Sequence, residues 1–235
     1  MYKTKPCFRC SMPSDAPLNV LALNASLKHE PELSNTGELA SLVLDEIRAL
    51  APINADVVRL ADATLPVGLG FREAQKDDWP ELVTRIKGAD VVLFCTPIWW
   101  GGRSSLIQRV IERLDALDEE YSASGRSAIK GKVAGVVVTG SEDGALSVMG
   151  SIMMVLSWMG FTLPPECAAY WVGEVGQPTS QDRDKRLRNM ATMHMAKGLA
   201  QNLVYYARLL KAHPQTHVAG KATCCEMHAH LDAPV

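Results

Sequence analysis

Apolar residues along the chain gather into short unbroken runs, and the segments between these runs show a different, helical spacing. The runs cover residues 18–23, 55–60, 90–95, 133–140 and 167–172. Continuous apolar runs of this length, several of them rich in β-branched residues, are typical of strands that are buried on both faces. The pattern therefore predicts five parallel strands with helices packed over them.

The intervals between the runs carry apolar residues three or four positions apart, as amphipathic helices do. Such spacing covers residues 39–50, 79–86, 107–114, 143–159 and 181–212. Strands that alternate with helices indicate an α/β fold, an open, doubly wound five-stranded parallel sheet. Because neither a repeat nor a linker interrupts the alternation, we expect one domain over 17–212, with tails at 1–16 and 213–235.

Composition agrees with a single domain and excludes some partners. The chain has 235 residues, 47% of them hydrophobic, with 24 basic and 26 acidic side chains. Without a basic stripe, nucleic acid is not an expected partner. The N-terminus has no apolar stretch of the secretory kind, and the longest apolar stretch, 148–159, is shorter than the ~20 residues of a membrane helix. We expect a soluble cytoplasmic protein without a membrane partner.

The cysteines divide into two groups. Cys95 and Cys167 lie in apolar contexts and are predicted to be buried thiols. The other four lie near the chain ends and are Cys7, Cys10, Cys224 and Cys225. Together with nearby histidines these four could bind zinc, but chain ends are seldom ordered and the spacing fits no familiar zinc finger. We predict no metal site.

In a doubly wound sheet the ligand binds beyond the carboxyl ends of the strands, which selects the loops 24–36, 96–105 and 139–145. The first loop opens a helix and offers hydroxyls, an amide and a lysine, which suits a phosphate monoester. These candidates are Ser26, Lys28, Ser34, Asn35 and Thr36. Asn35 and Glu38 have the spacing of a capping box, so a capped helix start behind a polar loop is the alternative.

The second loop reads TPIWWGGRSS. Pro97 is expected to end the strand, and Ser104 or Ser105 to cap the next helix. Trp99 and Trp100 are either anchors of that helix or a surface on which a flat ring stacks. Because adjacent residues leaving a strand point in different directions, both are not expected in the core, and we place one indole at the edge of a cleft.

The third loop, TGSEDGA, follows the fourth run and opens another helix. Its two glycines allow close approach of a ligand to the backbone. Ser141, Glu142 and Asp143 could contact the polar edge of a heterocycle, while an N-cap role for Asp143 is the alternative. An anion site, a stacking surface and a polar-edge loop at one end of a sheet are together what flavin mononucleotide (FMN) requires.

Several stretches carry a family resemblance: LNVLALNASLK with SNT, ADVVLFCTPIWWGGRSSLIQRVIERLDAL, GKVAGVVVTGSEDGA and MGFTLPPECAAYWVGE. The chain resembles the flavodoxin-like NADPH-dependent FMN reductase family. The resemblance implies that the first-loop residues named above hold the phosphate. It implies that the ring is lined by Pro97, Ile98, Trp99, Trp100, Gly101, Thr139, Gly140, Ser141, Glu142, Asp143 and Gly144.

The resemblance also implies an activity, in which hydride passes from NADPH or NADH through FMN to a flavin, a quinone, or a nitro or azo compound. Because the flavin supplies the chemistry, we name no catalytic side chain. Two alternatives stay open. A one-electron carrier usually has a more acidic surface than the net charge of −2 provides, and a flavin-free binding module would share the fold.

The helix expected at 143–159 is apolar nearly all round, with Val148 and Ile152 on one side and Met149 and Leu156 on another. A helix that covers one sheet needs a single apolar stripe, so we expect a homodimer or homotetramer. Cover by the long C-terminal helix is the competing explanation.

Overall fold

A computed structural model describes residues 16–214, apart from the side chains of 118 and 119, and its centre is a sheet of parallel strands. The strands are β1 (Leu18–Asn24), β2 (Ile53–Arg59), β3 (Val91–Trp99), β5 (Val133–Gly140) and β6 (Ala168–Val172). Their order across the sheet is β2-β1-β3-β5-β6, and all neighbours run parallel. The predicted doubly wound sheet is confirmed.

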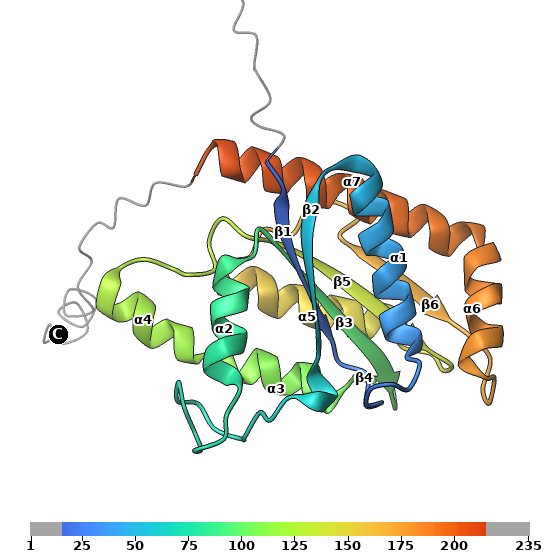
Figure 1. Cartoon of the computed structure of the whole chain (residues 1–235), viewed down its shortest axis with the longest axis horizontal. Helices are drawn as coiled ribbons and strands as arrows, with labels where there is room; N and C mark the ends of the chain where they lie inside the picture. Colours follow the sequence, from blue (N-terminus) through green and yellow to red (C-terminus); the bar gives the residue numbers. More distant parts are fainter. Residues whose placement is uncertain (1–15, 215–235) are drawn as a thin grey trace, which may run out of the picture.

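Helices cover both faces of this sheet (Figure 1). They are α1 (Asn35–Leu50), α2 (Trp79–Gly88), α3 (Ser105–Arg113), α4 (Ala116–Ser124), α5 (Ala145–Met159), α6 (Thr179–Arg188) and α7 (Met190–Ala212). One buried cluster joins the sheet to α2, α3 and α5. A second joins it to α1 and α7, where Leu39, Val43, Leu199 and Leu203 are fully buried.

The C-terminal helical pattern proves to be two helices. The chain breaks at Asn189, whose backbone is extended and whose side chain accepts a hydrogen bond from the Thr192 N–H, so α7 starts with a new cap. Leu187 and Met190, two apolar residues of the expected helical pattern, are 42% and 82% exposed. The prediction of one helix over 181–212 was wrong at this point.

Pro97 does not end its strand, contrary to the sequence prediction. β3 continues to Trp99 and then turns back into β4 (Gly102–Arg103), which pairs antiparallel with it. The Cys95 carbonyl accepts a hydrogen bond from the Ala25 N–H, so it points toward the β1 side of β3. Backbone groups two residues apart in a strand point the same way, so the nitrogen of Pro97 also faces the β1 side. The pairing of β1 with β3 ends at Cys95, before Pro97. Proline has no backbone N–H, but no hydrogen bond of the sheet is lost because no strand pairs with β3 on that side of Pro97.

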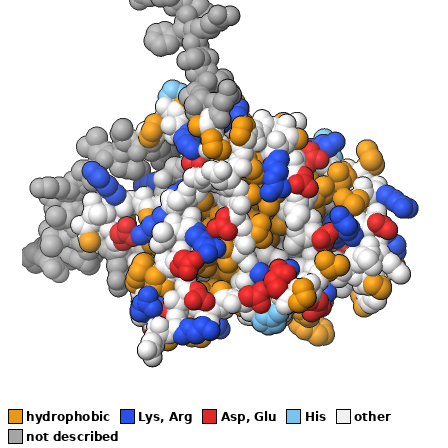
Figure 2. Space-filling model, in the orientation of Figure 1, with side chains coloured by type: hydrophobic (Ala, Val, Ile, Leu, Met, Phe, Trp, Pro, Cys, Tyr) orange, Lys and Arg blue, Asp and Glu red, His pale blue; other side chains and the backbone are white. Residues whose placement is uncertain are grey.

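The surface carries mixed charge, with basic and acidic side chains interleaved on the face that Figure 2 shows. Within residues 16–214, no helix is long and apolar enough to cross a membrane, and no cluster of His, Cys, Asp and Glu has the geometry of a metal site. Cys95 and Cys167 are free and buried, as predicted, and burial raises the pKa of both thiols. The four terminal cysteines lie outside the described residues.

Candidate active site

The three loops selected from the sequence meet at the carboxyl edge of the sheet and enclose a cleft of about 420 Å³. Two contacts join them directly. The hydroxyls of Thr36 and Thr139 lie 2.7 Å apart, which connects the first loop to the third. The backbone N–H of Trp100 donates to Glu142 Oε1 over 2.6 Å, which connects the second loop to the third.

One end of the cleft is formed by the start of α1. Ser34 is the N-cap, and its hydroxyl accepts from the Gly37 N–H, so the cap lies one residue before the predicted Asn35. Asn35 is instead the first helical residue, and its buried Oδ1 accepts no hydrogen bond from the described residues. Free N–H groups of the first turn attract an anion. We call this region the anion end of the cleft.

Lys28 adds a positive charge to the anion end. Its Nζ donates to the Leu33 carbonyl over 3.0 Å and to Thr179 Oγ1 over 3.2 Å, and it lies 3.2 Å from Glu32 Oε1. The ammonium group is therefore held beside the first turn of α1 by groups on both sides of the cleft. Its side chain keeps 40% of its surface exposed, so a ligand can reach it.

The other end, which we call the ring end, is formed by the second and third loops. Trp99 is 50% exposed and Trp100 93%, so neither indole belongs to the core. Gly101 and Gly144 both have left-handed backbone, with φ of 71° and 118°. A Cβ on Gly144 would lie 3.0 Å from Gly101 Cα, so the two loops approach each other at a point where a side chain does not fit.

Most of the sequence-predicted residues line the cleft. They are Ser26, Lys28, Asn35, Thr36, Pro97, Ile98, Trp99, Trp100, Thr139, Gly140, Ser141 and Glu142. Four do not line it: Ser34 caps α1, Gly101 and Gly144 form the contact between loops, and Asp143 precedes α5. Asp143 is not the cap of α5 either, because the N-cap is Gly144 and no side chain caps this helix.

The segment after β6 supplies one wall of the cleft that was not predicted from the sequence. Its lining residues are Glu174, Val175, Gly176, Gln177 and Asp182. β6 ends at the same edge as β1, β3 and β5, so the rule that selected the other loops could have selected this one. The buried Gln177 Oε1, like Asn35 Oδ1, has no hydrogen-bond partner among the described residues.

Asp182 anchors this wall. It is buried, and it accepts hydrogen bonds from Trp171 Nε1 over 2.7 Å and from Arg186 Nη1 over 2.6 Å. Burial lowers the pKa of Arg186, and the Asp182 carboxylate opposes that shift. A Cβ on Gly173 would lie 2.1 Å from Asp182 Oδ1. The first turn of α6 is thus fixed against the end of β6, which holds Gln177 and Glu174 at the cleft.

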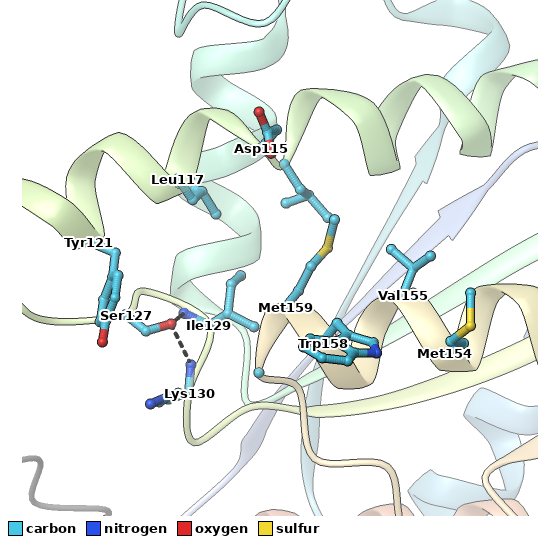
Figure 3. A pocket seen from close by; sticks show the side chains of 12 residues that line it. Asp115, Leu117, Tyr121, Ser127, Ile129, Lys130, Met154, Val155, Trp158 and Met159 are labelled. Atoms are coloured by element: carbon cyan, nitrogen blue, oxygen red, sulfur yellow. Dashed lines mark hydrogen bonds between the residues drawn. The ribbon is translucent and has the colours of Figure 1, made fainter. Parts of the chain in front are cut away.

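A larger cavity, of about 530 Å³, lies elsewhere, between α4, the C-terminal half of α5 and residues 127–130 (Figure 3). Its lining is mainly apolar, with Met154 and Trp158 of α5 labelled beside it in Figure 3. The helix start in its lining carries an acidic residue, Asp115, and the lining has neither the glycine-rich loops nor the unpaired amides of the smaller cleft. The smaller cleft is therefore the candidate functional site on chemical grounds, not on size.

The cleft fits an FMN molecule in charge and in hydrogen-bonding capacity. The anion end supplies a helix N-terminus, Lys28 and the hydroxyls of Ser26 and Thr36, which suit a phosphate. The unpartnered carbonyl oxygens of Asn35 and Gln177 are acceptors for hydroxyl groups such as those of a ribityl chain. The ring end supplies indole surface for a flat heterocycle.

Comparison with known proteins agrees with this geometry. The family model for NADPH-dependent FMN reductase matches residues 18–174. The "8-demethyl-8-aminoriboflavin-5'-phosphate synthase" of Streptomyces davaonensis is 29% identical over 208 residues, which are 85% of this chain and 80% of that protein. A Mycobacterium bovis protein named "Divalent metal cation transporter MntH" is 32% identical over 205 residues; the match spans 83% of this chain but only 29% of that relative's length.

Solved structures give the same result. The crystal structure of RosB with the bound intermediate 8-demethyl-8-formylriboflavin-5'-phosphate has a TM-score of 0.76 and 26% identity, and the match covers 92% of this chain and 88% of that one. The apo form of the NADH:FMN oxidoreductase EMOB has a TM-score of 0.61 at 19% identity, over 92% and 100% of the two chains, which supports the fold. The chain belongs to the NADPH-dependent FMN reductase family of flavin-related oxidoreductases with a flavodoxin-like fold.

Proposed function

We propose that this protein is an NAD(P)H-dependent oxidoreductase that binds FMN in the cleft and reduces a small-molecule acceptor such as free flavin, a quinone, or a nitro or azo compound. The single observation that carries the proposal is one cleft with an anion end and an aromatic ring end, in a chain of this family. Bound flavin supplies hydride and electron transfer, while the protein supplies binding, orientation and electrostatics.

The described residues have distinct tasks in this proposal. Lys28 and the first turn of α1 bind the phosphate, and Asn35 and Gln177 accept hydrogen bonds from the polyol. Gly144 lets the second and third loops meet closely beside the ring end, because a side chain there would meet the backbone of Gly101. Asp182, which accepts a hydrogen bond from Trp171 of β6, holds the wall after β6 in place.

The test is an anaerobic stopped-flow experiment on FMN-loaded protein. NADPH or NADH is expected to bleach the flavin absorbance band, and catalytic amounts of protein are expected to turn over a quinone or free flavin. If dithionite bleaches the bound flavin but neither nucleotide does, the reductase proposal is wrong and a carrier of the flavodoxin type is favoured. If the protein is colourless and takes up no FMN, a flavin-free binding module is the remaining hypothesis.

A second candidate function is supported by the relatives that match beyond residue 174. Both the Streptomyces davaonensis synthase and RosB have names that refer to modified riboflavin 5'-phosphates, and their matches cover 85% and 92% of this chain. In this alternative the flavin phosphate in the cleft is the substrate and leaves it chemically altered. The acceptor-reducing activity and the flavin-altering activity use the same cleft but give different products.

Mass spectrometry of the flavin separates the two candidates. FMN is incubated in air with the protein, a nicotinamide nucleotide and an amino acid as amino-group donor, the protein is removed, and the flavin mass is measured. An unchanged mass with an oxidised nucleotide supports the reductase. A changed mass that requires the native protein, and that is absent after heat denaturation, supports the second candidate.

The proposed assembly is a homodimer or homotetramer. The residues that the sequence analysis placed on two sides of α5 are in fact packed or partly packed inside this chain, but a third stripe is exposed: Leu146 (73%), Met154 (60%) and Trp158 (89%). The long helix α7 packs on α1, β5 and β6. We propose that a second copy covers the exposed stripe, and that the protein acts in the cytoplasm, where free thiols such as Cys95 persist.

A further inference from the structure

The ionisable side chains of the cleft differ in how they are paired. The lining contains Lys28, Glu142, Glu174 and Asp182. Glu174 Oε1 lies 2.8 Å from Lys185 Nζ, and Asp182 Oδ2 lies 2.6 Å from Arg186 Nη1. Lys28 has the carboxylate neighbour described above. Three of the four charged side chains therefore already have a partner of opposite charge within the protein.

Glu142 is the exception. Among the side chains that the structure describes, no Lys, Arg or His forms an ion pair with it. Its Oε1 accepts the Trp100 N–H over 2.6 Å, a bond that spans the second and third loops. This bond fixes the carboxylate at the ring end without neutralising its charge.

The surroundings of this carboxylate are aromatic. Trp99 and Trp100 line the same cleft with half or more of their surface exposed. Trp100 has a φ of 49°, a left-handed conformation that residues other than glycine rarely adopt. Because the Glu142 bond is made by the backbone of this residue, the unusual conformation and the fixed carboxylate belong to one arrangement.

A carboxylate without an ion-pair partner, in a cleft that also has exposed indoles, attracts cations and repels anions. An ammonium or a cationic ring gains from the Glu142 charge and from the negative faces of the indoles. A carboxylate or phosphate at the same place meets an uncompensated negative charge. The anion end, with Lys28, has the opposite preference, so the two ends of the cleft are polarised.

We propose that the ring end, beside the flavin ring that it holds, also takes a small organic cation, a protonated amine or a cationic aromatic ring, and that Glu142 with Trp99 and Trp100 selects it over anionic compounds. The inference deepens the proposed function, because the selected molecule would be the second substrate beside the flavin. It does not depend on which of the two candidate reactions takes place.

Three probes with the same ring and different charge test the proposal: 1-methylnicotinamide (cationic), nicotinamide (neutral) and nicotinate (anionic). Each is titrated against FMN-loaded protein, with tryptophan emission and the flavin band as readouts. The cation is expected to bind about tenfold tighter than the anion, and the difference is expected to shrink as ionic strength rises. Equal affinities of the cation and the anion for the wild-type protein would overturn the proposal.

Glu142→Gln is the diagnostic variant, because its amide oxygen can still accept the Trp100 N–H while the charge is lost. In this variant the ratio between cation and anion is expected to fall below about threefold. Glu46→Gln on α1, outside the cleft lining, removes the same charge and is expected to keep the full ratio. An unchanged ratio in Glu142→Gln, or the same loss in both variants, would contradict the assignment to Glu142.

The titrations distinguish failure of the proposed function from failure of the cation subsite. If the protein takes up no FMN, the flavin proposal fails, and the same probes are titrated against the protein as purified. Glu142 and the indoles are present in either case, so the cation preference and its loss in Glu142→Gln are still expected. Absence of the preference there overturns the cation subsite on its own.

Discussion

The hydroxyl oxygens of Thr36 and Thr139 lie 2.7 Å apart, and both side chains are buried. Thr36 belongs to the first turn of α1, and Thr139 is the penultimate residue of β5, in register with Pro97 of β3. The pair therefore links the anion end to the strand that carries the ring-end loop. It sets the spacing between the anion end and the ring end, which we propose contact different parts of one ligand.

Replacing one partner of this pair should cost more than replacing both. Thr139→Val leaves a buried hydroxyl on Thr36 without its partner and is expected to lower the free energy of unfolding by about 1–3 kcal/mol. The double variant Thr36→Val/Thr139→Val removes both polar groups and should recover most of that loss. Urea unfolding of the wild type and the three variants measures the coupling; additive losses would show that the two hydroxyls do not interact.

Lys28 should contribute to binding through the phosphate alone. Lys28→Met is expected to weaken FMN binding by about 1.5–3 kcal/mol, because a charge-assisted contact is lost, and to leave riboflavin binding unchanged. Titration of both flavins against the variant and the wild type gives the comparison. Lys76→Met, in an exposed loop outside the cleft lining, serves as the control. An equal loss for riboflavin and FMN would contradict the placement of the phosphate at the anion end.

The tryptophans of the ring end should report ligand binding. FMN is expected to quench tryptophan emission, and Trp99→Ala or Trp100→Ala to weaken FMN binding by about 0.5–1.5 kcal/mol. Trp158→Phe, at the far end of α5, should leave both the affinity and most of the quenching intact. Wild-type affinity in both ring-end variants would mean that the indoles do not touch the flavin.

The exposed stripe on α5 should mediate self-association. Light scattering at micromolar concentration is expected to give a dimer or larger, and Met154→Glu to give a monomer, because a charge in an apolar interface is left unpaired. Tyr205→Glu, at a residue of α7 that is 52% exposed, should keep the wild-type mass. A monomeric wild type would show that the stripe is not an interface between copies.

Acid should weaken the protein through Asp77. Its pKa lies below the ordinary 3.8: burial would raise it, but hydrogen bonds from Arg113 and from the Glu73 and Trp79 N–H groups outweigh that effect. A lowered folded-state pKa gives stability that is present above pH 3.8 and is lost as the pH falls through the folded-state value. Asp77→Asn leaves the buried Arg113 charge unpaired, and should cost about 3 kcal/mol at pH 7.

Chemical unfolding at pH 7 and between pH 4 and 2 measures both effects. Below pH 3.8 the stability of the wild type should fall with a steeper slope than that of Asp77→Asn, because the variant has no carboxyl to protonate at this position. Parallel slopes would show that another group controls acid unfolding.

The sheet could be predicted from the sequence because continuous apolar runs mark strands covered on both faces, and most of the cleft followed from the carboxyl-edge rule. Other features depend on tertiary contacts. α4 has weak apolar periodicity and is closed by Gly125 in a left-handed conformation. The wall after β6 depends on the direction of α6, which the hydrogen bond from Trp171 Nε1 of β6 to the buried Asp182 of α6 fixes. The spacing of apolar residues alone predicts neither the end of α4 nor the direction of α6.

The close packing of α7 against the sheet means that the folding unit and the family match differ in length. A Cβ on Gly135 of β5 would lie 2.9 Å from Leu93 Cδ2 and 3.1 Å from Leu199 Cδ1 of α7, so helix and sheet touch at van der Waals distance. The family match ends at residue 174, before α7 begins. A fragment cut at that boundary would carry the family's sequence signature but would expose to water the part of the sheet face that α7 covers beside α1. The cooperative folding unit is therefore longer than the segment by which the family is identified, and expression boundaries should be chosen from the helix.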